Sequence, residues 1–214
     1  MVHHSNDASQ LKIGEVVPDF ALTCNQEKVH RLSDYRGAKV LLCFYDYAHC
    51  PQCAYSVGNL IGYQKKLAWA SKLKVITVFL TNKEVLRDGL TNKNAPIPSL
   101  CDGSLYPFLA LADPDGKAAS SFRIGTKSKF PRSRREIVFQ YQRKRANSKV
   151  FPPLPVSNFL PAEFLIDENG VLVDALQAKK KTEVMAMERI EAFLLGNQKE
   201  ILESKRKSLL RYVM

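Results

Sequence analysis

Two stretches of the chain are almost continuously apolar over eight residues, and a segment with helical spacing separates them. Residues 39–46 (KVLLCFYD) and 74–81 (KVITVFLT) have the pattern of strands that are covered on both faces. Between them, Val57, Leu60 and Ile61 recur at the spacing of one helix face. Strand, helix and strand in this order predict a right-handed parallel crossover.

Shorter extended segments precede and follow this central unit. Residues 14–22 and 29–34 predict a leading β-hairpin, and residues 109–112 predict a further strand. Residues 163–167 and 171–176 are joined by Glu-Asn-Gly, a sequence typical of the turn of a hairpin. Strands are therefore expected at both ends of the fold.

The remaining periodic segments predict helices. Asn82 is expected to cap a short helix over residues 83–90, and residues 118–123 are expected to form another after the turn DPDG. Thr182 is the predicted cap of a helix that ends at Gly196. A basic helix is expected from there to the C-terminus.

Length and composition fit one globular domain with appendages. The chain has 214 residues, of which 45% are hydrophobic and 25% charged, and its longest apolar runs have the length of strands. No run approaches the ~20 residues of a membrane-spanning helix. The first ten residues, MVHHSNDASQ, lack the order of a secretory signal, so we expect a cytoplasmic protein.

The net charge of +11 is concentrated in two places. Residues 127–149 contain nine basic residues and one acidic residue, and residues 179–214 contain nine basic and five acidic residues. Phe130, Phe139 and Tyr141 lie among the basic residues of the first segment. This mixture suits an acidic protein or a nucleic acid as partner, although a solvated surface is the more ordinary interpretation. The C-terminal helix offers a narrow apolar face that suits docking on the body or on a second subunit.

Five cysteines, an odd number, argue against a disulfide scaffold, and two of them form the motif Cys50-Pro-Gln-Cys53. Cys50 is placed at the N-terminus of the predicted helix, where unpaired N–H groups and the helix dipole favour a thiolate. Cys50 is therefore the candidate nucleophile, and Cys53 is the candidate resolving thiol. His49 stands next to the motif and can add positive charge or carry a proton.

Two other interpretations of the motif stay open. A CxxC can be half of a zinc site, but no second cysteine or histidine pair follows it. Two inert buried cysteines are the other alternative, because free cysteine is often part of a core. A sulfur pair that is splayed apart, sealed in the interior or bound to a metal would speak against redox chemistry. Cys43, inside an apolar strand, is expected to fill the core, and Cys24 and Cys101 have no activating surroundings.

Four segments in this order resemble the AhpC/TSA branch of the thioredoxin superfamily, the peroxiredoxin-like redoxins: GEVVPDFAL, RLSDYRGAKVLLCFYDYAHCPQC, LADPDGKAASSFRI and LPAEFLIDENGVL. The resemblance implies an α/β, thioredoxin-like fold with a central mixed β-sheet flanked by helices. The expected organisation is a flexible N-terminus over residues 1–10, a redoxin domain over 11–195 with a basic insertion at 127–158, and a basic C-terminal helix over 196–214.

The resemblance leaves the activity divided between two chemistries. A typical peroxiredoxin has Pro seven residues and Thr or Ser three residues before its reactive cysteine, where this chain has Cys43 and Tyr47, and Pro161 stands where an arginine would be expected. Thioredoxin-like proteins carry a cis-proline at the position that Pro161 resembles. CxxC with such a proline favours thiol–disulfide exchange over peroxide reduction.

The proposed cycle uses Cys50 and Cys53 against a disulfide or a peroxide, with a thioredoxin- or glutathione-like dithiol as external donor. Within the chain, it requires no cofactor, metal, flavin or nucleotide. A peroxiredoxin-like peroxidase is the first alternative. A non-catalytic binding or assembly subunit that acts through the basic segment is the second.

Overall fold

The computed structural model describes residues 10–66, 73–95, 97, 106–124, 159–180 and 183–196, and the structural statements below refer to these residues. Several expectations fall outside them: the N-terminal residues 1–9, the basic insertion, the C-terminal helix and Cys101.

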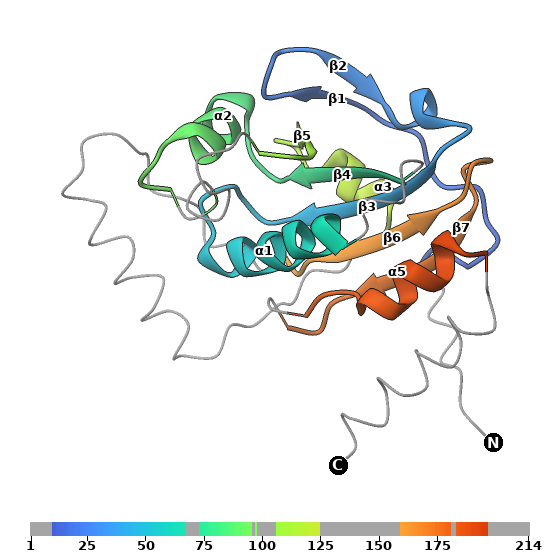
Figure 1. Cartoon of the computed structure of the whole chain (residues 1–214). Coiled ribbons are helices and arrows are strands. Elements are labelled where there is room, and N and C mark those ends of the chain that lie inside the picture. The colour runs from blue at the N-terminus through green and yellow to red at the C-terminus, as the bar shows by residue number, and fades with distance from the viewer. Residues whose placement is uncertain are drawn as a thin grey trace.

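The centre of the fold is a seven-stranded mixed sheet with the strand order β2-β1-β5-β4-β3-β6-β7 (Figure 1). The strands are β1 (Ala21–Cys24), β2 (Val29–Arg31), β3 (Lys39–Tyr45), β4 (Leu73–Phe79), β5 (Leu109–Ala112), β6 (Ala162–Ile166) and β7 (Leu172–Gln177). Strands β3, β4 and β5 are parallel to one another, and β6 is antiparallel to β3. Both predicted hairpins, β1–β2 and β6–β7, are antiparallel pairs, but β1 lies at residues 21–24 and not at 14–22 as predicted.

Helices cover both faces of the sheet, as the mixed α/β prediction requires. Helices α1 (Pro51–Lys66) and α5 (Met187–Leu194) lie on one face, and α3 (Lys117–Ser121) lies on the other (Figure 1). Helix α2 (Lys83–Thr91) follows β4, and η1 (Leu32–Tyr35) is a short 3₁₀ turn after β2. The Asn82 cap is confirmed, because its side chain accepts the Val85 N–H at 2.8 Å.

Strand β3 is apolar at nearly every position because both of its faces are buried. Leu41, Cys43 and Tyr45 pack into a core beneath α1 and α5, while Leu42 and Phe44 pack into a second core on the face of α3. Successive side chains of a strand point to opposite faces, so a strand covered on both sides has no position for an exposed polar group. The buried central strand thus places the start of α1 at its carboxyl end.

The cap predicted for the last helix is wrong. Helix α5 begins at Met187, after Ala186 in extended conformation, and Gly196 follows it with φ of 72°. The segment before Met187 is held by other contacts: the Met185 N–H donates to the Glu163 carboxylate at 2.5 Å. Because the Met185 N–H donates to a side chain of the sheet, the helix begins nearer to the C-terminus than the sequence suggests.

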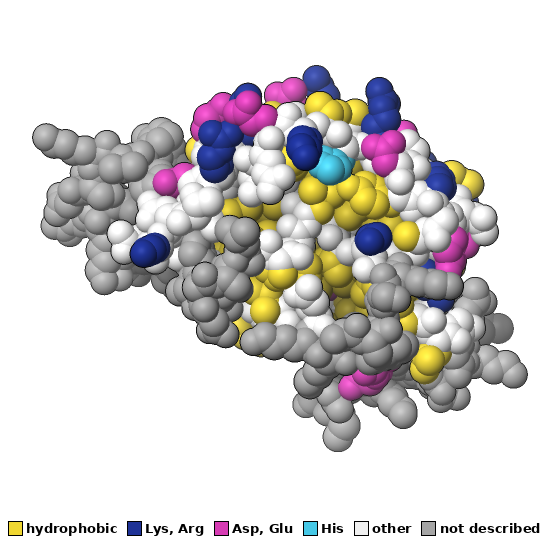
Figure 2. Space-filling view, turned by 45° about the horizontal axis from the view of Figure 1, so that its top comes forward, with side chains coloured by type: hydrophobic (Ala, Val, Ile, Leu, Met, Phe, Trp, Pro, Cys, Tyr) yellow, Lys and Arg dark blue, Asp and Glu magenta, His cyan; other side chains and the backbone are white. Residues whose placement is uncertain are grey.

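Charges of both signs mix over the described surface. Figure 2 shows acidic and basic side chains along the upper part of one face, with hydrophobic atoms exposed between and below them. Exposed ion pairs join Arg87 to Glu27 at 2.7 Å and Lys117 to Asp115 at 3.2 Å. Within the part of the chain that the structure describes, no helix is both long and apolar enough to cross a membrane.

Candidate functional site

Cys50 lies between the end of β3 and the first residue of α1. Its N–H donates to the Tyr47 carbonyl at 3.0 Å, and its own carbonyl accepts the Ala54 N–H at 3.0 Å. Its sulfur accepts the Cys53 N–H at 3.4 Å. The sulfur therefore receives one of the first helical N–H groups, which have no partner within a helix, and this arrangement stabilises a thiolate.

Cys53 follows in the first turn of α1 and faces the same sulfur. The pKa of its thiol is raised well above the usual value, chiefly by burial and then by its hydrogen bond to Cys50, the charge of Cys50 and the charge of Asp46. Cys53 thus remains a protonated thiol at neutral pH and can donate to a Cys50 thiolate. A nucleophile needs a stabilised thiolate, as at Cys50, and a resolving thiol can wait in its protonated form, as at Cys53.

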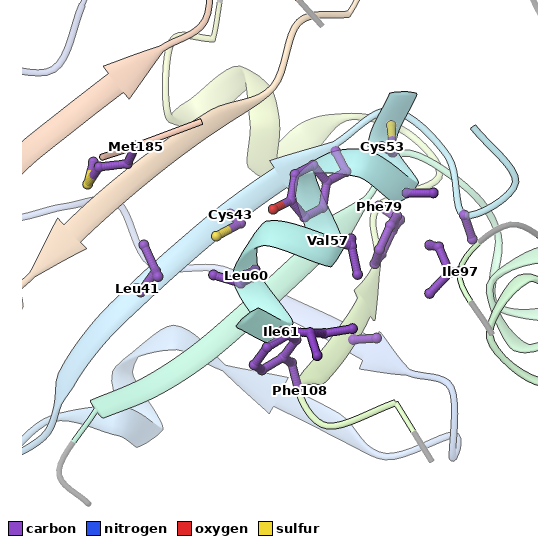
Figure 3. Packing of buried hydrophobic residues seen from close by; sticks show 14 of the residues in the cluster. Leu41, Cys43, Cys53, Val57, Leu60, Ile61, Phe79, Ile97, Phe108 and Met185 are labelled. Atoms are coloured by element: carbon purple, nitrogen blue, oxygen red, sulfur yellow. The ribbon is translucent and has the colours of Figure 1, made fainter. Parts of the chain in front are cut away.

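Both sulfurs are buried, which is one of the arrangements that the sequence analysis names as speaking against redox chemistry. Cys50 and Cys53 each have an exposed fraction of 1%, and both are free thiols. Figure 3 shows Cys53 at the start of α1, with Val57 and Leu60 leading down toward the sheet and Cys43 on β3. The pair is therefore not splayed apart, but attack on an external substrate requires the neighbouring groups to move.

His49 is also buried, and its side chain is paired with a different helix. Its Nε2 atom lies 3.0 Å from Oδ2 of Asp88 on α2, and its exposed fraction is 0%. The Asp88 carboxylate is one-third exposed and also accepts a hydrogen bond from the Asn92 amide at 3.3 Å. The imidazole is thus oriented from outside the motif, by a contact that the sequence did not reveal.

Pro161 precedes β6 at the edge of the sheet where the Cys50 loop emerges. The register of β3 with β6 pairs Phe44 with Ala162, so Pro161 lies near the carboxyl end of β3. The prediction of a cis bond is wrong, because the described residues contain no cis peptide bond. The Pro161 carbonyl accepts the Ala178 N–H at 2.9 Å, so the chain continues into the β6–β7 ladder with an ordinary trans bond and this carbonyl is already engaged.

Three buried or half-buried carboxylates near this region were missed from the sequence: Asp46, Asp88 and Glu163. Burial raises the pKa of Glu163 to about 7, although the Met185 N–H, Arg189 and Tyr45 lower it. The signal for Asp46 was an acidic residue directly after an apolar run, and the signal for Glu163 was an acidic residue inside one. Nothing in the sequence pattern indicated Asp88, which lies on a separate helix.

Cys43 is confirmed as a core residue. Its thiol is fully buried, and burial together with the charge of Glu163 raises its pKa well above the usual value. Cys24 is buried as well, on β1. Among the described residues, no cluster of three or more His, Cys, Asp or Glu side chains is arranged to hold a metal ion.

Comparisons with known proteins find a match to one family and to several solved structures. The model of the AhpC/TSA family matches residues 13–175. A Haemophilus influenzae protein assigned as peroxiredoxin bcp is 30% identical over 122 residues, which are 56% of this chain and 70% of the relative.

Solved structures show the same fold at low identity. A yeast mitochondrial 1-Cys peroxiredoxin is 13% identical with a TM-score of 0.62, over 88% of this chain and 79% of that one. A Chlorobium tepidum protein assigned as thiol:disulfide interchange protein DsbE is 20% identical with a TM-score of 0.53, over 88% of this chain and 99% of that one. Since one relative is named for peroxide chemistry and the other for disulfide interchange, the fold alone does not decide between them.

Proposed function

The chain belongs to the AhpC/TSA family and is a thiol oxidoreductase, and we propose that it acts by thiol–disulfide exchange through Cys50 and Cys53. The observation that carries this proposal is the contact between the Cys53 N–H and the Cys50 sulfur, 3.4 Å apart in the first turn of α1. The Cys53 thiol also hydrogen-bonds the Cys50 side chain, and two sulfurs in contact at the start of one helix are placed to form an intramolecular disulfide.

The reaction proceeds in two exchanges. The Cys50 thiolate attacks one sulfur of a substrate disulfide, a new bond forms between Cys50 and that sulfur, and the other substrate sulfur leaves as a thiolate that takes up a proton. Cys53 then gives up its proton and attacks the Cys50 sulfur, which releases the second substrate thiol. The substrate gains two electrons, and the protein is left with a Cys50–Cys53 disulfide. An external donor, one thioredoxin-like dithiol or two molecules of a glutathione-like thiol, reduces this disulfide.

Peroxide reduction is the second candidate, and the relative assigned as peroxiredoxin bcp favours it. In that reaction, the Cys50 thiolate attacks one oxygen of the O–O bond and becomes a sulfenic acid, and the other oxygen leaves and is protonated to an alcohol or water. Cys53 then condenses with the sulfenic acid to form the same disulfide with loss of water. Tyr47 stands where a peroxiredoxin would place Thr or Ser. The buried Arg189 is paired with Asp174 at 2.7 Å and is not free to activate a peroxide. Tyr47 and the paired Arg189 support exchange, whereas the cis-proline that also favoured it in the sequence analysis is absent from the described residues.

A single-turnover experiment on the reduced protein distinguishes the two reactions. Under the exchange proposal, a peptide disulfide is reduced much faster than hydrogen peroxide is consumed. The Cys50→Ser variant should lose this activity, and the Cys53→Ser variant should accumulate a mixed disulfide between Cys50 and the substrate, detected by mass. Cys24→Ser, another buried thiol, is the matched control.

Two results would refute parts of the proposal. Rapid peroxide consumption, with a sulfenic acid on Cys50 in the Cys53→Ser variant, would replace exchange by peroxidase activity. Undiminished turnover by Cys50→Ser would remove Cys50 from the chemistry altogether. The non-catalytic alternative rests on the basic segment, which lies outside the described residues.

A further inference from the structure

The segment that follows β7 begins at the end of the sheet where Cys50 lies. Strand β3 runs toward Cys50, and its Phe44 is paired with Ala162, the first residue of β6. Ala162 is in turn paired with Gln177, the last residue of β7. In Figure 1, the segment after β7 leaves the sheet at the same end as the start of α1. Residues that follow Gln177 are therefore placed near the redox motif.

Two exposed lysines, Lys179 and Lys180, lie just beyond the strand ladder. The backbone that carries them is fixed at two points. The Ala178 N–H donates to the Pro161 carbonyl at 2.9 Å, and the Lys179 N–H donates to the Glu183 carboxylate at 2.6 Å. Two positive charges are thus held beside the residue that leads into β6, the strand next to β3.

The segment then continues along the face of the sheet that α1 covers. The Met185 N–H donates to the Glu163 carboxylate of β6, and the Met187 N–H donates to the Tyr63 hydroxyl of α1. Met185 belongs to the same buried core as Cys53. The two lysines are therefore part of a segment that is anchored to the sheet at one end and to α1 at the other.

Positive charge predominates on this segment. Residues 179–185 contain three lysines and one glutamate, a surplus of two positive charges. The acidic residue of the loop before Cys50, Asp46, has an exposed fraction of 2% and offers little negative charge at the surface. The segment thus presents a positive charge to a partner that approaches Cys50.

The backbone at Pro161 offers a substrate peptide little to bind. Its nitrogen has no hydrogen to donate, and its carbonyl already accepts the Ala178 N–H. Cys50 has an exposed fraction of 1%, so neighbouring groups must move before its sulfur can attack. Side-chain charges on a fixed segment can hold a partner at this edge while that movement occurs.

We propose that Lys179 and Lys180 form a docking surface for the disulfide substrate of the exchange reaction, an acidic polypeptide segment whose carboxylates lie beside its disulfide. This inference rests on the proposed role of Cys50 and names the class of substrate that reaches it. A polypeptide fits this surface better than a nucleic acid does, because the lysines lie near a thiol pair and a nucleic acid brings no disulfide to it. Charge complementarity of this kind acts mainly on the rate of association and weakens with salt.

The test compares two peptides that share one sequence around a disulfide and differ only in charge. One has two glutamates on each side of the disulfide, and the other has glutamines at these positions. At low ionic strength, the reduced full-length protein should reduce the glutamate peptide with a kcat/KM about fivefold higher, which is the effect of a few exposed charge pairs. The preference should decrease at ~0.15 M salt, where the Debye length is ~8 Å.

Charge variants show whether these lysines cause the preference. Lys179→Gln combined with Lys180→Gln should lower the ratio of the two kcat/KM values to less than about twofold, and the corresponding double change to Glu should reverse the preference. Lys12→Gln combined with Lys74→Gln is the matched control, because both lysines are exposed and lie toward the opposite end of the sheet. An unchanged ratio in the first variant, or an equal loss in the control, would overturn the proposal.

Docking can also be measured without the exchange reaction. The same peptides, labelled for fluorescence anisotropy and with serine in place of both cysteines, should differ about fivefold in Kd, with the glutamate peptide bound more tightly. Equal binding of the two serine peptides by the parent would refute the docking surface even if exchange occurs. If the parent reduces neither disulfide peptide, exchange is refuted and the binding measurement alone decides the docking surface.

Discussion

Glu163 offers a direct test of the electrostatics inside the fold. It lies on β6, paired in register with Cys43 of β3, and its exposed fraction is 4%. The groups that face it are the Met185 N–H, the Tyr45 hydroxyl, the Arg189 guanidinium and, from α1, the Tyr63 hydroxyl. Burial raises its pKa from 4.5 to about 7 in spite of the partners that stabilise its charge.

The shift sets both the sign and the size of a pH effect on stability. Native Glu163 holds its proton more tightly than the unfolded chain does, so its contribution to stability is fully present below about pH 4.5 and is lost as the pH rises to about 7. A difference of about 2.5 units at ~1.36 kcal/mol per unit corresponds to about 3 kcal/mol over this window.

Glu163→Gln keeps the shape and the acceptor for the Met185 N–H but does not titrate. The stability of the variant minus that of the parent should therefore increase by up to about 3 kcal/mol between pH 4.5 and pH 7.5. Urea unfolding of both proteins at half-unit steps of pH, under reducing conditions, measures this difference. At a slope of ~1–3 kcal/mol per molar, the relative midpoints should move by about 1 M or more.

Both proteins contain all the other titratable groups, so the effects of those groups cancel in the difference between the two unfolding free energies. Glu84→Gln, which removes an exposed carboxylate from α2, is the matched control for the loss of a charge. A difference between Glu163→Gln and the parent that stays constant with pH, or one that decreases as the pH rises, would refute the idea that Glu163 is held protonated by burial.

Other contacts predict losses that the same urea assay can measure. Asp174→Asn leaves the Arg189 guanidinium without the carboxylate 2.7 Å away in a buried pair, and it should cost about 3–5 kcal/mol; a cost below about 1 kcal/mol would mean that the pair is solvated. Asn82→Ala removes the acceptor at the start of α2 and should cost about 1 kcal/mol, so an unchanged midpoint would contradict the cap. Gly89→Ala should cost about 1–3 kcal/mol because its Cβ would meet that of Ala48 at 2.4 Å; a gain in stability would disprove the close approach.

The sequence alone predicted those elements whose pattern is contained in a few neighbouring residues. Strand β3 is apolar because both of its faces are covered, and the turn between β6 and β7 has Gly170 at φ of 76°. Asp167 accepts the N–H groups of Asn169 and Val171 at 2.9 and 2.8 Å, which is the turn chemistry that the sequence indicated. The position of Cys50 at the start of α1 was equally readable, because a strand ends and a helix begins within a few residues.

The sequence by itself determined the order of strands and helices and the neighbouring positions of Cys50 and Cys53, since periodicity, capping and the first turn of a helix are properties of adjacent residues. Only the tertiary structure decided that both sulfurs are buried and that His49 faces Asp88. It also decided that Pro161 enters the sheet with a trans bond. Burial, charge pairing and sheet register depend on elements that are distant along the chain, and no local pattern encodes which of them will meet.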